Sequence, residues 1–531
     1  MKIGCISVKK RCFQECFETM SDFQKPQKYG DNATARKNKM NDLPFRVYAV
    51  KTKQKERMKR IMMTLLIGFM MMTGASAGQT EQIVRGAALY MADSLKLDSM
   101  YNYWNRYTLE HPKDEVAWRN LYEVYNEYEY RFLVNHKNYK TGKEISDAQE
   151  QMRRKVGFMY RMEQAIPDSY TFNYCAYDCG YEWLKYENPD DVPDILSTHY
   201  ANRAIELIPD KAARFDYDEW AGYLMGNLDT VRLTRLLTQY YENGLYPADE
   251  LQYHYNELQG MDEGAVYLGQ HNGNVIGKLI LQLVKGVHRD KILYNEACVV
   301  NYSPFLNGCI QRMGLSPQTA DSLRRNAQGF KGLERLLRYI FNNVKRPVYL
   351  SSNSISMLLF GEGVPDDLKQ YLYNEGLTIR YSAKPYDNLQ VKRRNVEERY
   401  LLDYLRFSFS PNSDRRNSYL SFHYLFLLKD LLPYYKMNNP DRFRWLNRLY
   451  HDVLAQMEDE GEGFLLGNKA FNIHKVENEQ GVHYEVEEWT VRYNESFTGL
   501  SGKVSKKDGL KYLTGEPIPT HVILKTEPVK D

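Results

Sequence analysis

The sequence is poor in cysteine and lacks an apolar run long enough to cross a bilayer. It has 7 cysteines in 531 residues, and no two of them form a CxxC pair. Its longest apolar run extends only from Ile61 to Met72, whereas a membrane-spanning helix needs about 20 apolar residues. The sequence therefore predicts neither a cysteine-based zinc site nor a transmembrane span in the mature chain.

Short motifs that mark common catalytic sites are also missing. From residue 78 onward there is no P-loop, no GxGxxG dinucleotide pattern, no GxSxG elbow and no HExxH pair. No close pair of carboxylates marks a glycosidase either. On this basis no catalytic residue, no metal ion and no cofactor is predicted.

An export signal is predicted near the N-terminus. Lys59 and Arg60 precede the apolar run, and the small residues 75–77 follow it, which is the pattern of a secretory signal peptide. Met58 is a natural start for this signal. We therefore expect a signal peptide at 58–77 and regard residues 1–57 as an upstream extension, disordered or the result of a mis-assigned start. A single membrane anchor is the weaker alternative, and the predicted location is the periplasm or cell envelope.

Removing this leader reverses the sign of the net charge. The whole chain carries +3, but residues 1–77 hold 16 Lys and Arg against 6 Asp and Glu, which leaves −7 for the remainder. A mildly acidic chain lacks the basic patch that nucleic-acid binding requires. We therefore expect no nucleic-acid partner.

Four cysteines remain after the leader: Cys175, Cys179, Cys298 and Cys309. Cys175 and Cys179 are four residues apart, which places them on one face of a helix, but the sequence offers no two further zinc ligands nearby. Packing of the thiols in a core is the favoured interpretation. A Cys298–Cys309 disulfide is a second alternative, since an oxidising compartment permits it.

The region 78–260 is predicted to be helical. Trp118, Leu121, Tyr122 and Tyr125 follow helical spacing. The segments HPKDEVAWRNLYEVY, IPDSYTFNYCAYDCGY and IPDKAARFDYDEWAGYL each open with proline and an acidic residue and continue into an aromatic-rich helix. They resemble degenerate tetratricopeptide-like repeats, although their spacing is irregular. The tyrosines suit packing between helices better than a concave binding surface.

The region 261–388 alternates between strands and helices. Strands are expected in GAVYLG, RDKILYNEACVVN, RPVYLSS and LTIRYSA, with helices at about 274–284, at KGLERLLRYIFNN and at PDDLKQYLYNEG. This alternation predicts an α/β, Rossmann-like domain with a mainly parallel sheet. A helical pair broken near Asn439 is expected at 389–460, and a β-rich tail with a hairpin at Gln480-Gly481 at 461–531.

Polar residues follow the expected strands. If the sheet is parallel, the loops after the strands meet at its carboxyl edge, where ligands bind in such folds. The candidate ligand-binding residues are Gln270, His271, Asn272, Gly273, Asn274, Asn301, Ser303, Ser351 and Asn353. Free backbone N–H groups at the start of the following helix suit an anion or a sugar hydroxyl. Asn and Gly also fit an ordinary connector, because both tolerate a positive φ.

Residues from about 262 to 460 resemble a known family. The order of GAVYLGQHNGNVIGKL, GVHRD, KRPVY and LYNEGLTIRYSAKP is similar to the soluble C-terminal region of bacterial multi-spanning membrane proteins related to protein O-mannosyltransferases. Where that family has acidic residues in the first loop, this chain has Gln270, His271 and Asn274. The family's transferase apparatus lies in membrane spans that this sequence lacks. The resemblance implies a secreted, stand-alone relative of the soluble module without glycosyl transfer of its own.

Three functions are compatible with these features. The favoured one is a non-catalytic binding or scaffold protein, in which the helical repeats hold a protein partner of the envelope and the α/β rim recognises a glycan. The first alternative is a hydrolase or transferase acting on envelope saccharides through the loop 269–274. The second is a structural component of an envelope complex, in which the rim has no ligand.

Overall fold

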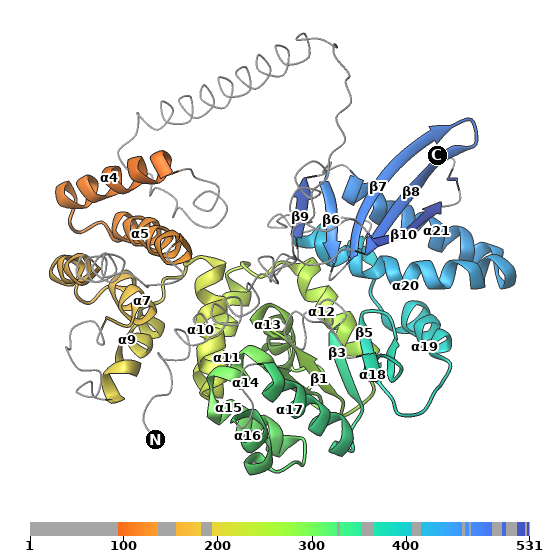
Figure 1. Cartoon of the computed structure of the whole chain (residues 1–531), viewed down its shortest axis with the longest axis horizontal. Coiled ribbons are helices and arrows are strands. Elements are labelled where there is room, and N and C mark those ends of the chain that lie inside the picture. Colours follow the sequence, from red (N-terminus) through yellow and green to blue (C-terminus); the bar gives the residue numbers. More distant parts are fainter. Residues whose placement is uncertain are drawn as a thin grey trace, which may run out of the picture. The chain divides into compact units, whose positions relative to one another are not determined.

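Figure 1 shows the protein as a computed structural model. It describes residues 94–135, 155–181, 194–325, 330–351, 366–405, 416–458, 462–466, 469–490, 502–505, 518–525 and 528–529. The predicted extension (1–57) and signal peptide (58–77) lie outside these residues, and so does Asn353. The chain divides into two compact units, the first ending at Leu207 and the second beginning at Ile208.

The described part of the first unit is helical. Its helices are α4 (Ser94–Glu110), α5 (Glu115–Asn135), a helix over 155–165, α7 (Tyr170–Cys179) and α9 (Asp194–Leu207). Pro112 lies in the turn between α4 and α5, and Pro167 in the turn before α7. The proline motifs thus separate successive helices, as predicted, but each proline precedes its helix instead of standing in the first turn. That these helices form repeats stays a prediction.

The aromatic stripe of α5 packs between helices. Trp118, Tyr122 and Tyr125 are at most 4% exposed, and their rings lie 5.7, 6.3 and 6.0 Å from the ring of Phe158. Such ring pairs add to the energy of apolar burial. The expectation that these tyrosines serve packing is confirmed for this stripe.

The second unit begins with three helices that pack against its sheet domain. They are α10 (Arg214–Gly226), α11 (Thr230–Glu242) and α12 (Ala248–Gly260). Leu233, Leu236, Leu237 and Tyr240 form the buried stripe of α11, at the helical spacing seen in the sequence. These helices and the sheet belong to one compact unit that begins at Ile208, and the expected domain boundary at residue 260 stays a prediction.

The central sheet has five strands in the order β2-β1-β3-β5-β4. The strands are β1 (Val266–Gly269), β2 (Ile292–Asn295), β3 (Val348–Ser351), β4 (Leu372–Asn374) and β5 (Thr378–Tyr381). β2 and β3 both pair in parallel with β1. β5 runs antiparallel to β3 and to β4. The sheet is therefore mixed, and the expectation of a mainly parallel sheet holds only for β1, β2 and β3.

One predicted helix is wrong. The segment 365–376 was expected to be helical throughout, but α18 covers only Asp366–Lys369 and β4 follows at once. The three residues 375–377 then connect β4 to β5, with Gly376 at φ 121°. So short a connection can only join antiparallel strands, because a parallel pair needs a crossover of a dozen residues or more. This explains why β5 runs antiparallel to β4.

Helices cover both faces of the sheet. Strand β1 leads into α13 (Asn272–Leu279), which continues as a π-helical turn over Ile280–Val284 and ends before Gly286 at φ 74°. Strand β2 leads into α14 (Glu296–Asn301), α15 (Ser303–Arg312), α16 (Pro317–Arg325) and α17 (Phe330–Asn343). Lys278 of α13 lies 4.2 Å from the ring centre of Tyr267 on one face. Phe341 of α17 stacks on Tyr381 on the other, at 4.4 Å.

The remainder of the second unit combines helices with a second sheet. α19 (Asn388–Arg394) continues as a π-helical turn (Asn395–Arg399) and is followed by a short 3-10 turn (Asp403–Leu405). The predicted helical pair is α20 (Arg416–Asn438) and α21 (Pro440–Glu458), which pack against each other. The second sheet has the order β10-β8-β7-β6-β9. Its strands are β6 (Glu462–Leu466), β7 (Lys469–Asn478), β8 (Gly481–Thr490), β9 (Gly502–Ser505) and β10 (Ile518–Lys525).

The predicted hairpin is confirmed, because β7 and β8 pair in antiparallel fashion around residues 479–480. The hairpin packs through Ile473, Tyr484 and Val486 onto the same apolar core as α20 and α21. Within the described residues, no helix combines the length and apolar character needed to cross a membrane. All four described cysteines are free thiols, so the Cys298–Cys309 disulfide is not formed, and Cys175, Cys298 and Cys309 are buried.

Candidate functional site

The strand order places a topological switch between β1 and β3. From β1 the chain crosses to β2 on one side of it, and from β2 it crosses back to β3 on the other side. The α13 connection covers one face of the sheet and the α14 to α17 connection covers the other. In open sheets of this kind, ligands bind beyond the carboxyl ends of the two strands at the switch. The candidate site is therefore the end of β1, Gly269 to His271, together with Ser351 at the end of β3.

The loop after β1 is held by Asn274. Its side-chain oxygen accepts hydrogen bonds from the backbone N–H groups of Gln270 and His271, at 3.2 and 3.3 Å. The Asn274 N–H donates to the His271 carbonyl at 3.0 Å. These three N–H groups are thus not free for an anion. Of them, only the Asn274 N–H belongs to the first turn of α13, where free N–H groups were expected. Asn274 is buried, whereas His271 and Gly273 are exposed and Gln270 is half-buried.

Helix α10 covers the β2 side of this edge. The Asn272 amide donates to the Asp218 carbonyl at 3.3 Å and accepts from Asn295 at 2.8 Å. A methyl group on Gly222 would overlap the Asn272 amide, and one on Gly226 would overlap the Tyr302 ring. Two glycines one helical turn apart therefore let α10 approach the loop closely. Asn272 serves this contact and is not available to a ligand in this arrangement.

Asn301 and Ser303 do not form the expected loop after β2. That strand ends at Asn295, and Asn301 is the last residue of α14, where its amide donates to the Ala297 carbonyl at 2.8 Å. Ser303 is exposed and begins α15. The expectation was wrong because the apolar run VV at 299–300 belongs to a helix and not to the strand.

Ser351 and Thr378 lie side by side at the end of β3. They are register partners across β3 and β5, and both are 0% exposed. Ser351 lies on the same face of the sheet as Tyr267. Burial raises the pKa of the Tyr267 phenol and the charge of Glu257 raises it further, whereas the Ser351 side chain lowers it. Of the predicted residues, the structure thus brings Gln270, His271 and Ser351 to the switch point.

A buried polar cluster lies behind this loop. Lys278, Glu257 and His254 are 0, 1 and 1% exposed. Lys278 forms an ion pair with Glu257 and lies 2.9 Å from His254 Nδ1. It also donates to the Asn274 carbonyl at 2.7 Å, and the Tyr267 hydroxyl donates to Glu257 Oε1 at 3.0 Å. Through Asn274 the cluster is linked directly to the loop after β1.

The cluster is balanced in charge. Burial alone raises the pKa of Glu257, but Lys278 and His254 outweigh it and the pKa is lowered. Burial, followed by the charge of Lys278, lowers the pKa of His254. The arrangement is thus a glutamate–lysine ion pair beside a neutral imidazole. A methyl group on Gly277 would overlap the His254 ring, so the cluster is tightly packed.

Sequence reasoning missed the residues at the end of β2. Asn295 pairs in register with Gly269 and its side chain caps α14 by accepting from the Ala297 N–H at 3.1 Å. Glu296 follows, 7% exposed, and burial raises its pKa to about 8. The signal in the sequence was Asn-Glu directly after the apolar run ILY, a combination that caps a helix.

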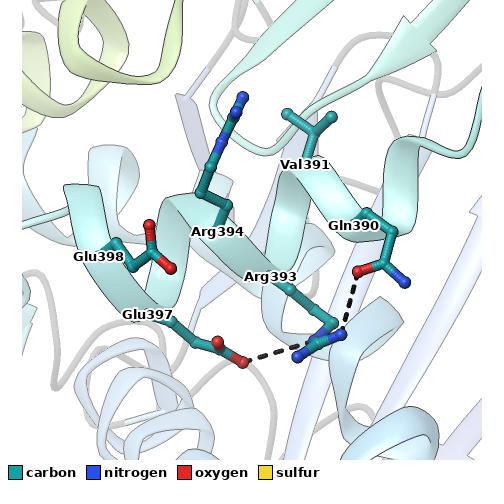
Figure 2. Close-up of a pocket in the computed structure, with 6 residues that line it drawn as sticks. All are labelled: Gln390, Val391, Arg393, Arg394, Glu397 and Glu398. Carbon is teal, nitrogen blue, oxygen red and sulfur yellow. Dashed lines mark hydrogen bonds and ion pairs between the residues drawn. The ribbon is translucent and has the colours of Figure 1, made fainter.

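A hollow of about 310 Å³ lies along α19 and the π-helical turn that follows it. Figure 2 shows Arg393 turned toward Gln390 and Glu397, whereas Arg394 points away from them. Arg393 donates to Gln390 at 3.0 Å and lies 3.4 Å from Glu397. The lining residues all come from one helical segment and carry both signs of charge.

No protein-family model matches the chain, and no curated protein or solved structure shows significant similarity to it. Among the described residues, no group of three or more His, Cys, Asp or Glu side chains is arranged to hold a metal ion.

Proposed function

We propose that the protein is a non-catalytic binding protein of the cell envelope, and that its second unit binds a saccharide at the carboxyl ends of β1 and β3. The observation that carries this proposal is the switch between these strands, at which the chain places Gln270, His271 and Ser351. The side chains are an amide, an imidazole and a hydroxyl. Such groups complement sugar hydroxyls, whereas phosphate recognition relies on Lys, Arg or free helix N–H groups.

The preorganised loop supports the same function. Asn274 fixes the backbone of Gln270 and His271, and Lys278 in turn holds the Asn274 carbonyl. A site whose backbone is fixed before binding loses less entropy when the ligand arrives. Helix α10 packs against Asn272 and the α14–α15 junction, so the proposed ligand contacts the loop through Gln270 and His271.

The first unit is proposed to hold a protein partner. Three large apolar side chains of this unit are strongly exposed: Tyr103 at 41%, Leu109 at 63% and Tyr160 at 56%. Exposed aromatic and aliphatic side chains are the usual anchors of protein interfaces. Export through the segment 58–77 belongs to the same proposal, and N-terminal sequencing of the exported protein tests it. A mature N-terminus well away from residue 78 would contradict it.

Binding assays with point variants test the proposed site. Purified residues 78–531 would be screened on an array of bacterial envelope glycans, and hits would be titrated by calorimetry. We expect Gln270→Ala and His271→Ala each to weaken binding about five- to tenfold, the size of one net hydrogen bond. Glu263→Ala is the matched control, because Glu263 is exposed and lies before β1, at the other end of that strand.

Two results would replace the proposal. A saccharide product released by the purified protein, and lost in the His271→Ala variant, would establish the hydrolase or transferase alternative. If no glycan binds and the variants still capture an envelope partner as well as the wild type does, the protein is better described as a structural component of an envelope complex. The sheet edge then has no ligand.

A further inference from the structure

The helix that follows the switch-point loop is weak on its own. α13 spans only the 8 residues Asn272–Leu279, and two of them, Gly273 and Gly277, are glycines. Glycine is, after proline, the least favourable residue in a helix, and so short a helix is marginal in isolation. The first turn of α13 therefore needs support from outside the helix to keep Asn274 in one position.

Lys278 provides this support. Its side-chain nitrogen has three partners: it forms an ion pair with Glu257, lies 2.9 Å from His254 Nδ1 and donates to the Asn274 carbonyl oxygen at 2.7 Å. An ammonium group has three N–H donors and no acceptor, so each donor of Lys278 has one acceptor. Lys278 is thus a junction between α12, which carries Glu257 and His254, and the first turn of α13.

The contacts form a circuit around the loop after β1. The Tyr267 hydroxyl of β1 donates to Glu257 Oε1 at 3.0 Å, and Glu257 pairs through Oε2 with Lys278. Lys278 donates to the Asn274 carbonyl, and the Asn274 side-chain oxygen accepts the N–H groups of the two loop residues 270 and 271. The circuit starts in the strand before the loop and ends in the loop itself.

We infer that Lys278 is a positioning residue of the switch-point site and that Glu257 of α12 orients it. Because Gln270 and His271 are the proposed ligand contacts, this role rests on the proposed function. Lys278 and Glu257 are 0 and 1% exposed, so both act on the ligand only through Asn274 and the loop. Their effect on affinity is therefore separate from their effect on stability.

A double variant separates the two effects. Lys278→Met alone leaves the charge of Glu257 buried without its partner, so it lowers the stability and loosens the loop together. Lys278→Met combined with Glu257→Leu removes both charges and restores stability, but the hydrogen bond to the Asn274 carbonyl is still absent. If the pair serves stability alone, the double variant regains the loop as well. If Lys278 positions the loop, the double variant is stable and its loop stays loose.

The measurement is amide hydrogen exchange of purified residues 78–531 without any ligand. Mass spectrometry with electron-transfer fragmentation follows the N–H groups of Gln270 and His271. The amides of Tyr267 and Leu268, which belong to the paired part of β1, are the internal reference. We expect Gln270 and His271 to exchange about five- to tenfold faster in the double variant than in the wild type, the size of one net hydrogen bond. The reference amides should stay within twofold.

Two further variants calibrate the exchange rates. Asn274→Ala removes the acceptor of both loop N–H groups and should accelerate their exchange at least as much. Lys392→Met is the matched control, because the Lys392 side chain is 7% exposed and pairs with Asp430 at 2.5 Å, on α19 and outside the circuit. Exchange of the loop amides should stay within twofold of the wild type in Lys392→Met.

Affinity is then measured by calorimetry with any glycan selected on the array. We expect the double variant to bind that glycan about five- to tenfold more weakly than the wild type, and Lys392→Met to bind it within twofold. Wild-type exchange of the loop amides in the double variant, or wild-type affinity despite faster exchange, would overturn the inference. Equal acceleration of the loop and reference amides would also overturn it, because general destabilisation then explains the result.

The outcomes separate this inference from the proposed function. If the double variant behaves like the wild type and Gln270→Ala still weakens binding, the proposed function stands and Lys278 has no positioning role. If no glycan binds to the wild type, the proposed function fails, and the exchange rates alone decide whether Lys278 holds the loop.

Discussion

Lys278 and Glu257 form an ion pair in which the two side chains are 0 and 1% exposed. Breaking a buried pair leaves a charge without its partner, which typically costs about 3 to 5 kcal/mol. We expect Lys278→Met and Glu257→Leu each to lower the free energy of unfolding of the second unit by about that amount, measured by urea denaturation.

The double variant and a surface pair provide the controls for this prediction. Lys278→Met combined with Glu257→Leu removes both charges and is expected to recover most of the lost stability. Asp168→Asn breaks the exposed pair with Arg203, in which the Asp168 and Arg203 side chains are 69 and 33% exposed. It should cost much less stability than either single variant of the buried pair, because water screens exposed charges. Equal losses in the single and double variants would show that the charges do not stabilise each other.

The glycines of α10 are predicted to be indispensable for its contact with the sheet edge. Gly222→Ala and Gly226→Ala would press a methyl group into Asn272 and into the Tyr302 ring. We expect each to destabilise the second unit by about 1 to 3 kcal/mol, as overpacking does. Thermal unfolding measures the effect.

Gly157→Ala is the opposite case. Gly157 lies within helix 155–165, and nothing lies within 4 Å of an added methyl group. Alanine at such a position should stabilise the first unit by about 0.5 to 1 kcal/mol. A loss of stability in Gly157→Ala as large as that in Gly222→Ala would contradict the steric explanation.

The pKa of Glu296 predicts a pH-dependent stability. Burial raises that pKa from 4.5 to about 8, so the folded state holds the proton more tightly than the unfolded state. The contribution is fully present below pH 4.5 and is lost as the pH rises toward 8. We expect the free energy of unfolding of Glu296→Gln to match that of the wild type at pH 4.5 and to exceed it by a few kcal/mol, at most about 5, at pH 9.

Urea denaturation at pH 4.5, 7 and 9 provides this measurement, and Glu334→Gln is the control because Glu334 is 35% exposed in its pair with Arg338. A difference between Glu296→Gln and the wild type that stays constant over this range would show that the carboxyl group ionises normally in the folded protein.

Leu228 occupies a left-handed backbone conformation, with φ 58°, between α10 and α11. This conformation costs a leucine about 1 to 2 kcal/mol of stability, whereas asparagine adopts the left-handed region more readily. Since Leu228 is 49% exposed, we expect Leu228→Asn to keep or raise the melting temperature of the second unit. A clear drop would show that the contact of Leu228 with Gly308 outweighs the backbone strain.

Hydrophobic periodicity was sufficient to predict the elements with long or well-bounded patterns. It located β1, β3, α17, the α20–α21 pair and the β7–β8 hairpin, and it placed the end of the helix after β1 before Gly286. It failed at 365–376, where short apolar runs fit a helix and a strand equally well. The connection of three residues around Gly376, which fixes β5 as antiparallel, was the signal that could have corrected it.

The candidate site was only partly predictable because it depends on contacts between distant segments. Gln270 and His271 follow a recognisable strand, so their place at the carboxyl edge could be derived. Asn274 holds the loop through local contacts that span at most four residues. That α10 covers Asn272, by contrast, depends on how segments 54 residues apart in sequence pack together. The pairing of Lys278 with Glu257 could not be predicted from the sequence either, because a buried charge pair leaves no local sequence pattern.

The cluster around Glu257 has a consequence for dividing the polypeptide. A fragment cut at residue 260, where the alternation of strands and helices begins, would lack the helix that carries Glu257 and His254. Lys278 would then be left as a solitary ammonium against Tyr267, with its apolar surroundings opened to water. The smallest piece able to fold autonomously should therefore start close to Ile208, and shorter expression fragments should be recovered as aggregates.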